Sequence, residues 1–186
     1  MTDQPATDWE FESVFADALE AVPEEHMDPE RFVPGVGPLS ADVLLVGEAP
    51  GKREVAEGEP FVGQAGAQLD RVLESIGFDR RDHYLTNLVK VRPPENRDPY
   101  VAEIEAWRPV LDAEIERVDP AVLVPLGSFA TKTLLDTDET ITDLHGQRLE
   151  RDGRTVVPSF HPAAALYDRS KVDAIESDLS TALELA

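Results

Sequence analysis

Residues 43–51 read VLLVGEAPG, a run of aliphatic side chains that leads directly into a loop rich in glycine and proline. A short apolar run bounded by such residues predicts a buried β-strand. Glu48 comes at the end of this strand. Because open α/β folds hold their ligands at the carboxyl edge of the sheet, the position makes the Glu48 carboxylate a candidate functional group.

Polar side chains follow two further predicted strands in the same way. Asn87 comes after the apolar stretch His83–Thr86, and His161 comes after Val156–Phe160. The carboxyl ends of parallel strands meet at one edge of a sheet, so we expect these side chains to converge with Glu48. The sequence therefore predicts a site built from a carboxylate, an amide and an imidazole.

Each of these residues also has a structural interpretation. Glu48 could cap a loop, Asn87 could form a strand-end turn, and His161 could be a buried, hydrogen-bonded histidine. Phe61 lies in the loop between Gly58 and Gly63, where an aromatic ring is either a stacking platform for a planar base or a plug in the core. The proline after His161 restricts its backbone, which fixes a side chain able to donate to a developing oxyanion.

Strands and helices alternate along the chain. This order predicts a parallel sheet with helices on both faces, in a single domain spanning residues 1–186. An amphipathic helix is expected over Trp9–Val22, within an acidic N-terminal segment of residues 1–30, and a long loop is expected to reach Gly66. The remaining expected elements are strands at 42–47, Tyr84–Val89 and Ala121–Leu126, helices at Ala67–Ile76, Val101–Val118 and Lys171–Leu185, a helix capped by Ser128, and a hairpin over Arg148–Val157 that turns at Asp152-Gly153.

Composition restricts the class of protein. A hydrophobic content of 41% in 186 residues is typical of a globular fold. The chain has neither an apolar run of membrane-spanning length nor a signal-peptide pattern, so we expect a cytoplasmic protein with no membrane association. The absence of cysteine excludes disulfides and thiolate metal sites, and we expect no bound metal.

The charge is strongly acidic, with 38 Asp and Glu against 17 Lys and Arg and a formal net charge of −21. Either the protein binds basic partners, or its acidic surface is a halophilic adaptation to high salt, which screens self-repulsion; we favour the second. The basic residues Lys52, Arg53, Lys90 and Arg92 lie close in sequence to the strand-end motifs. Their placement favours an anionic substrate at that edge of the sheet.

Taken together, the motifs resemble the uracil-DNA glycosylase superfamily, and most closely its family 4, the bacterial and archaeal type. Four motifs carry the resemblance in the same order, over roughly residues 33–184: GEAPG at 47–51, PFVGQAG at 60–66, TNLVKVRPPENRDP at 86–99 and HPAA at 161–164. The resemblance implies a three-layer α/β/α sandwich around a central four-stranded, mostly parallel sheet. It also implies removal of uracil from single- or double-stranded DNA by cleavage of the N-glycosidic bond.

The resemblance implies specific roles. Glu48 would orient or activate the attacking water and His161 would stabilise negative charge on uracil O2. The backbone around Gly47, Ala49 and Phe61 would hold the uracil together with the Asn87 amide, and the Phe61 ring would stack on it. Glu54 is a further candidate for positioning water. The residues expected to contact DNA are the four basic residues Lys52, Arg53, Lys90 and Arg92, with Pro162, Ala163 and Ala164 in the loop that would enter the duplex.

One feature departs from family 4, whose members typically hold an iron–sulfur cluster on four cysteines. Two of those positions are Val91 and Trp107 here, and the N-terminal cysteine pair is also absent. The cluster cannot form, so we expect no cofactor. We expect Val91, Trp107 and apolar residues of the N-terminal segment to fill its volume as a small hydrophobic core.

Two other functions remain open from the sequence. The chain could be a non-catalytic nucleic-acid-binding module of the same fold, or a glycosylase for another deaminated base such as hypoxanthine. The joint presence of Glu48, Asn87 and His161 argues against the first. A monomer is expected, because the protein must close around DNA.

Overall fold

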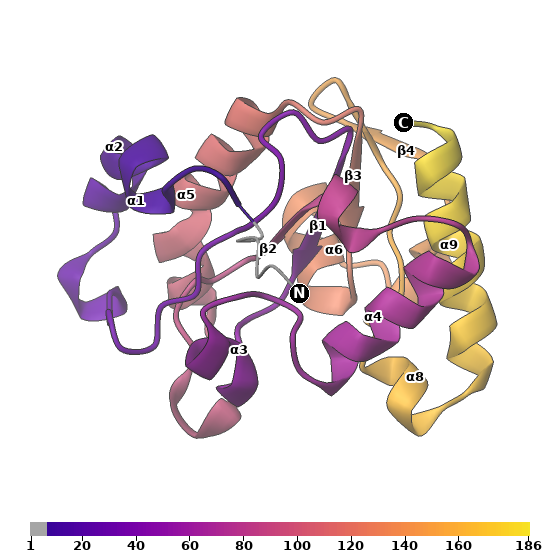
Figure 1. The fold of residues 1–186 in the computed structure, drawn as a ribbon, viewed down its shortest axis with the longest axis horizontal. Helices are drawn as coiled ribbons and strands as arrows, with labels where there is room; N and C mark the ends of the chain where they lie inside the picture. Colours follow the sequence, from indigo (N-terminus) through magenta and orange to yellow (C-terminus); the bar gives the residue numbers. More distant parts are fainter. Residues whose placement is uncertain (1–6) are drawn as a thin grey trace.

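The computed structural model describes residues 7–186, whose centre is a five-stranded sheet in the order β2-β1-β3-β5-β4 (Figure 1). Strands β2, β1, β3 and β5 run parallel, and β4 joins antiparallel to β5 at one edge. The predicted parallel sheet is confirmed, with β4 as an additional strand that the four-stranded expectation lacked. The strands are β1 (Val43–Gly47), β2 (Tyr84–Asn87), β3 (Val122–Pro125), β4 (Leu149–Arg151) and β5 (Arg154–Val156).

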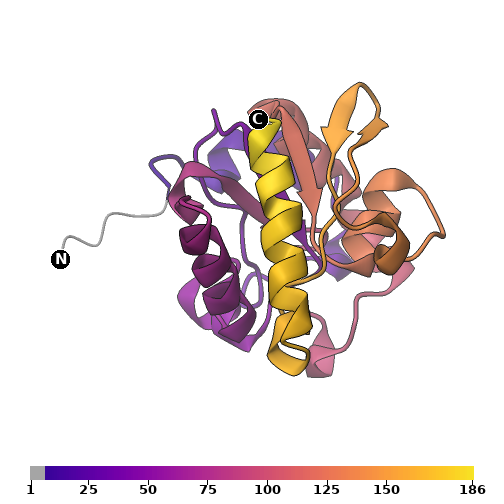
Figure 2. The ribbon, with the colours of Figure 1, turned by 90° about the vertical axis from the view of Figure 1, so that its right-hand side faces the viewer.

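Helices cover both faces of the sheet and form a three-layer α/β/α sandwich (Figure 2). Two long helices, α4 and α9, lie against each other on one face, and α5 and α6 cover the other. The α-helices are α1 (Phe11–Val14), α2 (Ala16–Glu20), α3 (Lys52–Glu57), α4 (Gln64–Ser75), α5 (Val101–Val118), α6 (Ser128–Leu135), α7 (Ile141–Leu144), α8 (Ala164–Tyr167) and α9 (Ser170–Glu184). Three 3₁₀ turns are η1 (Glu24–His26), η2 (Arg80–Asp82) and η3 (Pro94–Asn96).

The central strand β1 shows why both faces are covered. Val43 and Leu45 point into the core beneath α4 and α9, whereas Leu44 and Val46 point into the core beneath α5 and α6. Successive side chains of a strand face opposite sides, so a continuous apolar strand needs a layer of helices on each. Each fully buried aliphatic side chain stabilises the fold by about 1.5–3 kcal/mol relative to its exposed state.

The N-terminal segment differs from the predicted single helix over Trp9–Val22. Two short helices, α1 and α2, meet at Phe15, which has non-helical dihedral angles. Trp9 precedes both helices, and its indole N–H donates to the carbonyl oxygen of Gly37 at 2.9 Å. Phe11 and Phe15 pack together with ring centroids 4.8 Å apart. Tertiary contacts of the aromatic side chains therefore override the helical spacing. Residues 1–6 of the predicted acidic segment lie outside the described residues.

Two local predictions near the carboxyl edge are also corrected. Ser128 does not cap α6, because it is the first residue of that helix and Gly127 occupies the cap position. Gly127 has φ +90°, and a β-carbon there would lie 3.0 Å from Cβ of His161. The loop expected up to Gly66 contains α3 and the first turn of α4. The predicted turn at Asp152-Gly153 is confirmed, since β4 and β5 flank these residues.

Candidate active site

Glu48 and Asn87 lie side by side because their strands are neighbours. Gly47 of β1 pairs in register with Asn87 of β2, and the two chains stay hydrogen-bonded beyond the strands. The N–H of Leu88 donates to the Gly47 carbonyl oxygen at 2.9 Å, and that of Val89 donates to the Glu48 carbonyl oxygen at 3.3 Å. The parallel pairing of β1 and β2 thus places the backbones of Glu48 and Asn87 next to each other.

Gly47 is the point where the amide and the aromatic ring meet. A β-carbon on Gly47 would lie 2.5 Å from Oδ1 of Asn87 and 2.6 Å from Cζ of Phe61. Real β-carbons do not approach other atoms so closely, so this position accepts no side chain. Because Gly47 has no side chain, the side chains of Phe61 and Asn87 can both lie against it at the edge of the sheet.

Phe61 is held by a clamp that the sequence did not reveal. Its backbone has φ +56°, an uncommon value for a residue other than glycine, and its side chain is 5% exposed. The guanidinium of Arg80 donates to the carbonyl oxygens of Pro60 and Phe61 at 2.8 and 2.6 Å, and it pairs with Asp70 at 3.2 Å. Gly66 lies directly against the Phe61 carbonyl, where any β-carbon would collide. The Phe61 ring is therefore fixed rather than adaptable.

His161 reaches the same place, but not directly from a strand end. The strand expected over Val156–Phe160 ends at Val156, and beyond it only a single bridge joins Ser159 to Leu126. The ring centroid of His161 lies 6.0 Å from that of Phe61, although the two residues come from opposite halves of the chain. The backbone N–H of Ala163 donates to Nδ1 of His161 at 3.1 Å. Because Nδ1 accepts this bond, the ring proton of the neutral imidazole resides on Nε2. Burial lowers the pKa of His161 to about 4, so the ring is a neutral Nε2–H donor at ordinary pH.

The half-buried carboxylate of Glu48 has an unusual environment. Burial, together with the carboxyl group of Asp98 that hydrogen-bonds to it, raises its pKa to about 7. Two carboxyl groups in contact favour retention of a proton. Asp98 comes from the irregular segment after η3 and was not among the predicted site residues. Shifted acids in a concave site are typical of catalysis, which favours the functional interpretation of Glu48.

The carboxylate of Glu54 lies against Gly51 and Gly63. A β-carbon on Gly51 would lie 2.6 Å from its Oε2, and one on Gly63 would lie 3.3 Å from its Oε1. The side chain thus bridges the residues that precede α3 and α4. This contact indicates that Glu54 shapes the loop that carries Ala49 and Phe61.

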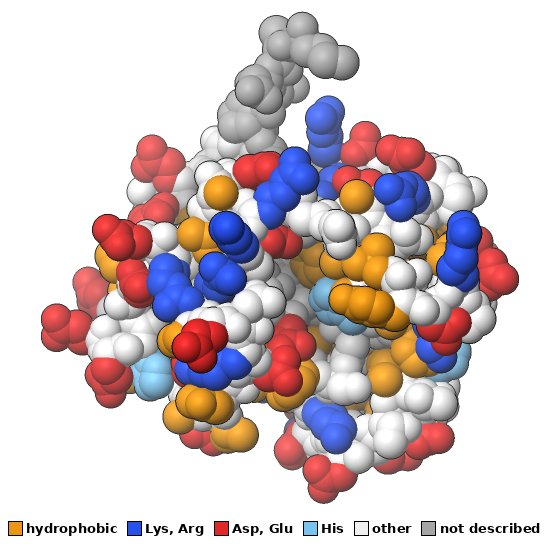
Figure 3. Space-filling view, turned by 90° about the horizontal axis from the view of Figure 1, so that it is seen from below, with side chains coloured by type: hydrophobic (Ala, Val, Ile, Leu, Met, Phe, Trp, Pro, Cys, Tyr) orange, Lys and Arg blue, Asp and Glu red, His pale blue; other side chains and the backbone are white. Residues whose placement is uncertain are grey.

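The basic residues predicted to contact DNA divide into two groups. Lys52 and Arg53 are exposed on α3, and Arg53 pairs with Glu57 at 2.7 Å. Arg92 is half-buried and lies beside Arg31, whose carbonyl oxygen accepts the Arg92 N–H at 3.1 Å. Figure 3 shows the face that carries these segments, with Lys and Arg side chains gathered beside a central hollow and acidic side chains both next to the hollow and around the outline.

The prediction that Lys90 contacts DNA is wrong. Its side chain is completely buried, and Nζ lies 2.6 Å from Oε2 of Glu114 on α5. The stretch that leads into β1 covers this part of the chain, since the N–H of Val33 donates to the Lys90 carbonyl oxygen at 2.7 Å. A lysine in a stretch of basic residues was therefore mistaken for a surface residue.

The segment after His161 contributes both buried and exposed residues. Pro162 is buried, and Ala163 and Ala164 are half-buried at the start of α8. Leu166 and Tyr167 of α8 follow with 40% and 92% exposure. Exposed apolar side chains next to a catalytic cleft can enter a DNA duplex, and this pair was not predicted from the sequence.

An iron–sulfur cluster does not fit the volume around Val91 and Trp107. Trp107 is 1% exposed, and its ring lies 6.0 Å from that of Phe32. It belongs to an apolar cluster with residues of the N-terminal segment, as predicted; the cluster comprises Phe11, Phe15, Val22, Val89, Trp107 and Val110, with Val91 packed against it. Within residues 7–186 no group of histidine and acidic side chains is arranged to hold a metal ion.

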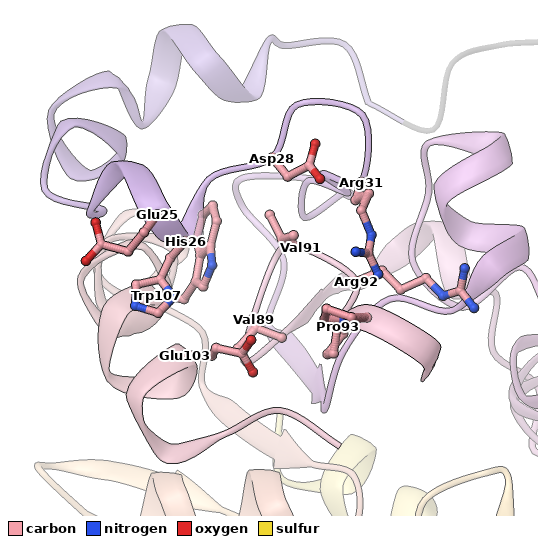
Figure 4. A pocket seen from close by; sticks show the side chains of 11 residues that line it. Glu25, His26, Asp28, Arg31, Val89, Val91, Arg92, Pro93, Glu103 and Trp107 are labelled. Carbon is pink, nitrogen blue, oxygen red and sulfur yellow. The ribbon is translucent and has the colours of Figure 1, made fainter. Parts of the chain in front are cut away.

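Beside this cluster lies a pocket of ≈ 140 Å³ (Figure 4). Arg31 and Arg92 lie along one side of it and Glu103 lies on the other. Glu103 already holds Arg97 through two bonds of 2.8 Å. The pocket contains none of the residues gathered around Gly47 and is a separate feature of the surface.

Comparison with known proteins agrees with this geometry. The sequence profile of the Uracil DNA glycosylase superfamily matches residues 34–184. A type-4 uracil-DNA glycosylase from Archaeoglobus fulgidus is 41% identical over 86% of this chain and 84% of its own length. A type-4 enzyme from Thermotoga maritima is 40% identical over 78% and 77%, and a type-5 enzyme from Pyrobaculum aerophilum is 33% identical over 72% and 66%.

Helices long and apolar enough to span a membrane are absent from the described part of the chain. The matched residues include Glu48, Asn87 and His161. The chain belongs to the uracil-DNA glycosylase superfamily, in which it resembles the type-4 enzymes while lacking cysteine.

Proposed function

We propose that the protein hydrolyses the N-glycosidic bond of deoxyuridine in DNA, releasing uracil and leaving an abasic site. The observation that carries the proposal is the convergence of Glu48, Phe61, Asn87 and His161 around Gly47 and the neighbouring strand ends. Similarity to curated type-4 uracil-DNA glycosylases over most of the chain supports it.

The Asn87 amide selects the base. Its oxygen accepts from uracil N3–H and its nitrogen donates to O4, whereas cytosine reverses both groups. When the wrong base binds, polar atoms of the site stay buried and unpaired. This can lower kcat/KM for the wrong base by on the order of 10⁴ relative to the correct one. The Phe61 ring supplies a stacking surface worth about 1–3 kcal/mol per base. Its clamp by Arg80 holds the ring in place before the base arrives.

His161 and Glu48 stabilise the two opposite charges that develop in the reaction. As the bond from C1′ to N1 breaks, its electron pair moves onto uracil, and Nε2–H of His161 donates to O2. The sugar becomes positively charged, and the ionised Glu48 stabilises it and orients a water molecule. The water oxygen bonds to C1′ and its proton passes to Glu48, while the uracil anion later takes a proton from solvent.

DNA must present the nucleotide outside the duplex, because the target bond is inaccessible in stacked DNA. We infer that Lys52, Arg53 and Arg92 contact phosphates around the hollow. Ala163 and Ala164, which follow the buried Pro162, would occupy the space that the base leaves, and Leu166 and Tyr167 would reach the neighbouring bases. Salt at molar concentration would screen the acidic remainder of the surface from the DNA.

The test is an excision assay on oligonucleotides that contain uracil, hypoxanthine or undamaged bases, single-stranded and duplex, at low and high salt. We expect free uracil and an abasic site from the first substrate, and Glu48→Gln as the matched control should release little. Release of hypoxanthine alone would assign a different base, and binding without release by the wild type would indicate a non-catalytic module.

Several expectations from the sequence stay predictions. We infer a monomer that acts as one domain in the cytoplasm without a cofactor. Size-exclusion chromatography with light scattering tests the monomeric state, and metal analysis of the purified protein tests the absence of a metal cofactor. A protein that carries iron would contradict the role proposed for Val91 and Trp107.

A further inference from the structure

Behind Asn87 lies a buried network that the proposed chemistry does not use. The ammonium group of Lys90 donates to the backbone carbonyl oxygen of Asn87 at 2.6 Å and lies 2.6 Å from Oε2 of Glu114. Oε1 of Glu114 accepts from the hydroxyl groups of Tyr84 and Thr86 at 3.0 and 2.8 Å. The side chains of Lys90 and Glu114 are both 0% exposed.

A pair of buried charges is a poor means of stabilising a fold. Removing two ions from water costs several kcal/mol each, and apolar residues of similar volume are often as stable or more stable. Burial lowers the pKa of Lys90 and raises that of Glu114, while their mutual attraction opposes both shifts. Stabilisation of the fold is therefore a poor explanation for the presence of Lys90 and Glu114 at these positions.

The buried pair of Lys90 and Glu114 contacts the backbone of Asn87. Asn87 ends β2, the edge strand of the sheet, where a carbonyl group loses the regular ladder of hydrogen bonds. Lys90 supplies a donor to that carbonyl from three residues along the chain, and Glu114 fixes Lys90 from a different helix. On the opposite side the Asn87 amide lies against Gly47. Lys90 thus holds Asn87 at its backbone carbonyl, next to the point where its side chain lies against Gly47.

We propose that Lys90 and Glu114 are specificity-determining positioning residues, which orient the Asn87 amide so that it reads uracil rather than cytosine. This inference rests on the proposed function. The physical reason is geometric: a binding group discriminates well when it is held within roughly 0.5 Å and 10–20° of its working position. Neither residue needs to touch the substrate.

The test compares binding of two non-cleavable oligonucleotides, one with 2′-fluorodeoxyuridine and one with 2′-fluorodeoxycytidine at the same position. The ratio of their dissociation constants isolates base reading from phosphate contacts. In Lys90→Met/Glu114→Gln both charges are removed at similar volume, so the protein should remain folded. We expect the preference for uracil to fall by on the order of tenfold, with unchanged affinity for undamaged DNA.

Tyr84→Phe is the matched control. It removes one hydrogen bond to Glu114 but keeps both contacts of Lys90. It should lower thermal stability and leave the uracil preference unchanged, which separates positioning from general destabilisation. Should the double variant not fold, Glu114→Gln alone weakens the hold on Lys90, and it should reduce the preference in the same direction.

The outcomes distinguish this inference from the function it rests on. A wild-type protein without preference for the uracil oligonucleotide would overturn the proposed function. A folded Lys90→Met/Glu114→Gln protein, or Glu114→Gln in its place, with the full wild-type preference would overturn the positioning role alone.

Discussion

The backbone N–H of Ala163 donates to Nδ1 of His161 over 3.1 Å, and this bond assigns the ring proton to Nε2. With a pKa near 4, the imidazole acts as a neutral donor. A neutral donor stabilises the departing uracil without drawing a proton from solvent, and His161 keeps this state over the whole physiological range.

Replacement of His161 should therefore depend on whether a donor is kept. His161→Leu should lower the single-turnover rate by about 10²–10³, the usual loss for one oxyanion donor, whereas His161→Gln should retain part of the activity. Because His161 stays neutral in this range, His161→Gln should leave the pH of any break in the pH–rate profile between pH 6 and 8 unchanged. A break that disappears in His161→Gln would contradict the neutral state.

Protonation of the Glu48 carboxylate should cause the loss of activity at low pH, the acidic limb of the pH–rate profile. Glu48 must be ionised to stabilise the sugar cation, and its pKa is raised to about 7 by burial and by Asp98. Activity should accordingly rise with pH through about 7 and reach a plateau above it. Glu48→Gln should be nearly inactive at every pH.

Asp98→Asn is the partner experiment for Glu48. It removes the carboxyl group that raises the Glu48 pKa, so the acidic limb should move to lower pH while the plateau rate changes little. The measurement is the pH dependence of kcat/KM for wild type and variant in parallel. If the acidic limb lies at the same pH in Asp98→Asn and wild type, a group other than the Glu48–Asp98 pair controls the loss of activity at low pH.

Asn87→Asp tests how the base is read. An ionised aspartate cannot offer uracil O4 the donor that the amide nitrogen provides, and a protonated one can pair with cytosine as well as with uracil. Uracil excision should fall, and selectivity over cytosine should drop by at least about tenfold. The assay compares excision from matched uracil and cytosine oligonucleotides, and equal selectivity in variant and wild type would refute the role.

Arg80→Ala tests the clamp on Phe61. Without the two hydrogen bonds to the Pro60 and Phe61 carbonyls, the strained backbone of Phe61 should relax and the stacking surface should be lost. We expect kcat/KM to fall about tenfold. Arg71→Ala is a matched control, because Arg71 bonds to Gln68 on its own helix and should leave kcat/KM within about twofold. Similar losses in both variants would reject the clamp.

The sequence was informative where local pattern and sheet topology coincide. Glu48 follows β1 and Asn87 ends β2, and parallel pairing of these strands brings the two residues together without further information. His161 lies beyond the end of β5, so strand pairing alone does not place it. The replacement of cysteine by Val91 and Trp107 was likewise readable, because apolar side chains next to an apolar N-terminal segment favour a common core.

The sequence was uninformative where contacts join distant residues. Lys90 resembles its basic neighbours, and its burial depends on the cover from Val33 and on Glu114. One signal was present: Glu114 lies on the same face of its predicted helix as Trp107 and Leu111, where a charge is out of place. Arg80 and Asp98 gave no comparable signal, because their roles arise from loops that meet in space.

The central claim is that Glu48, Phe61, Asn87 and His161 form one uracil site. A crystal structure of the protein with bound uracil tests it most directly. We predict the base stacked on Phe61, with Asn87 bonded to N3–H and O4 and Nε2 of His161 bonded to O2. Uracil bound elsewhere on the protein, or bound beside Gly47 without contact to Asn87 and His161, would contradict the account.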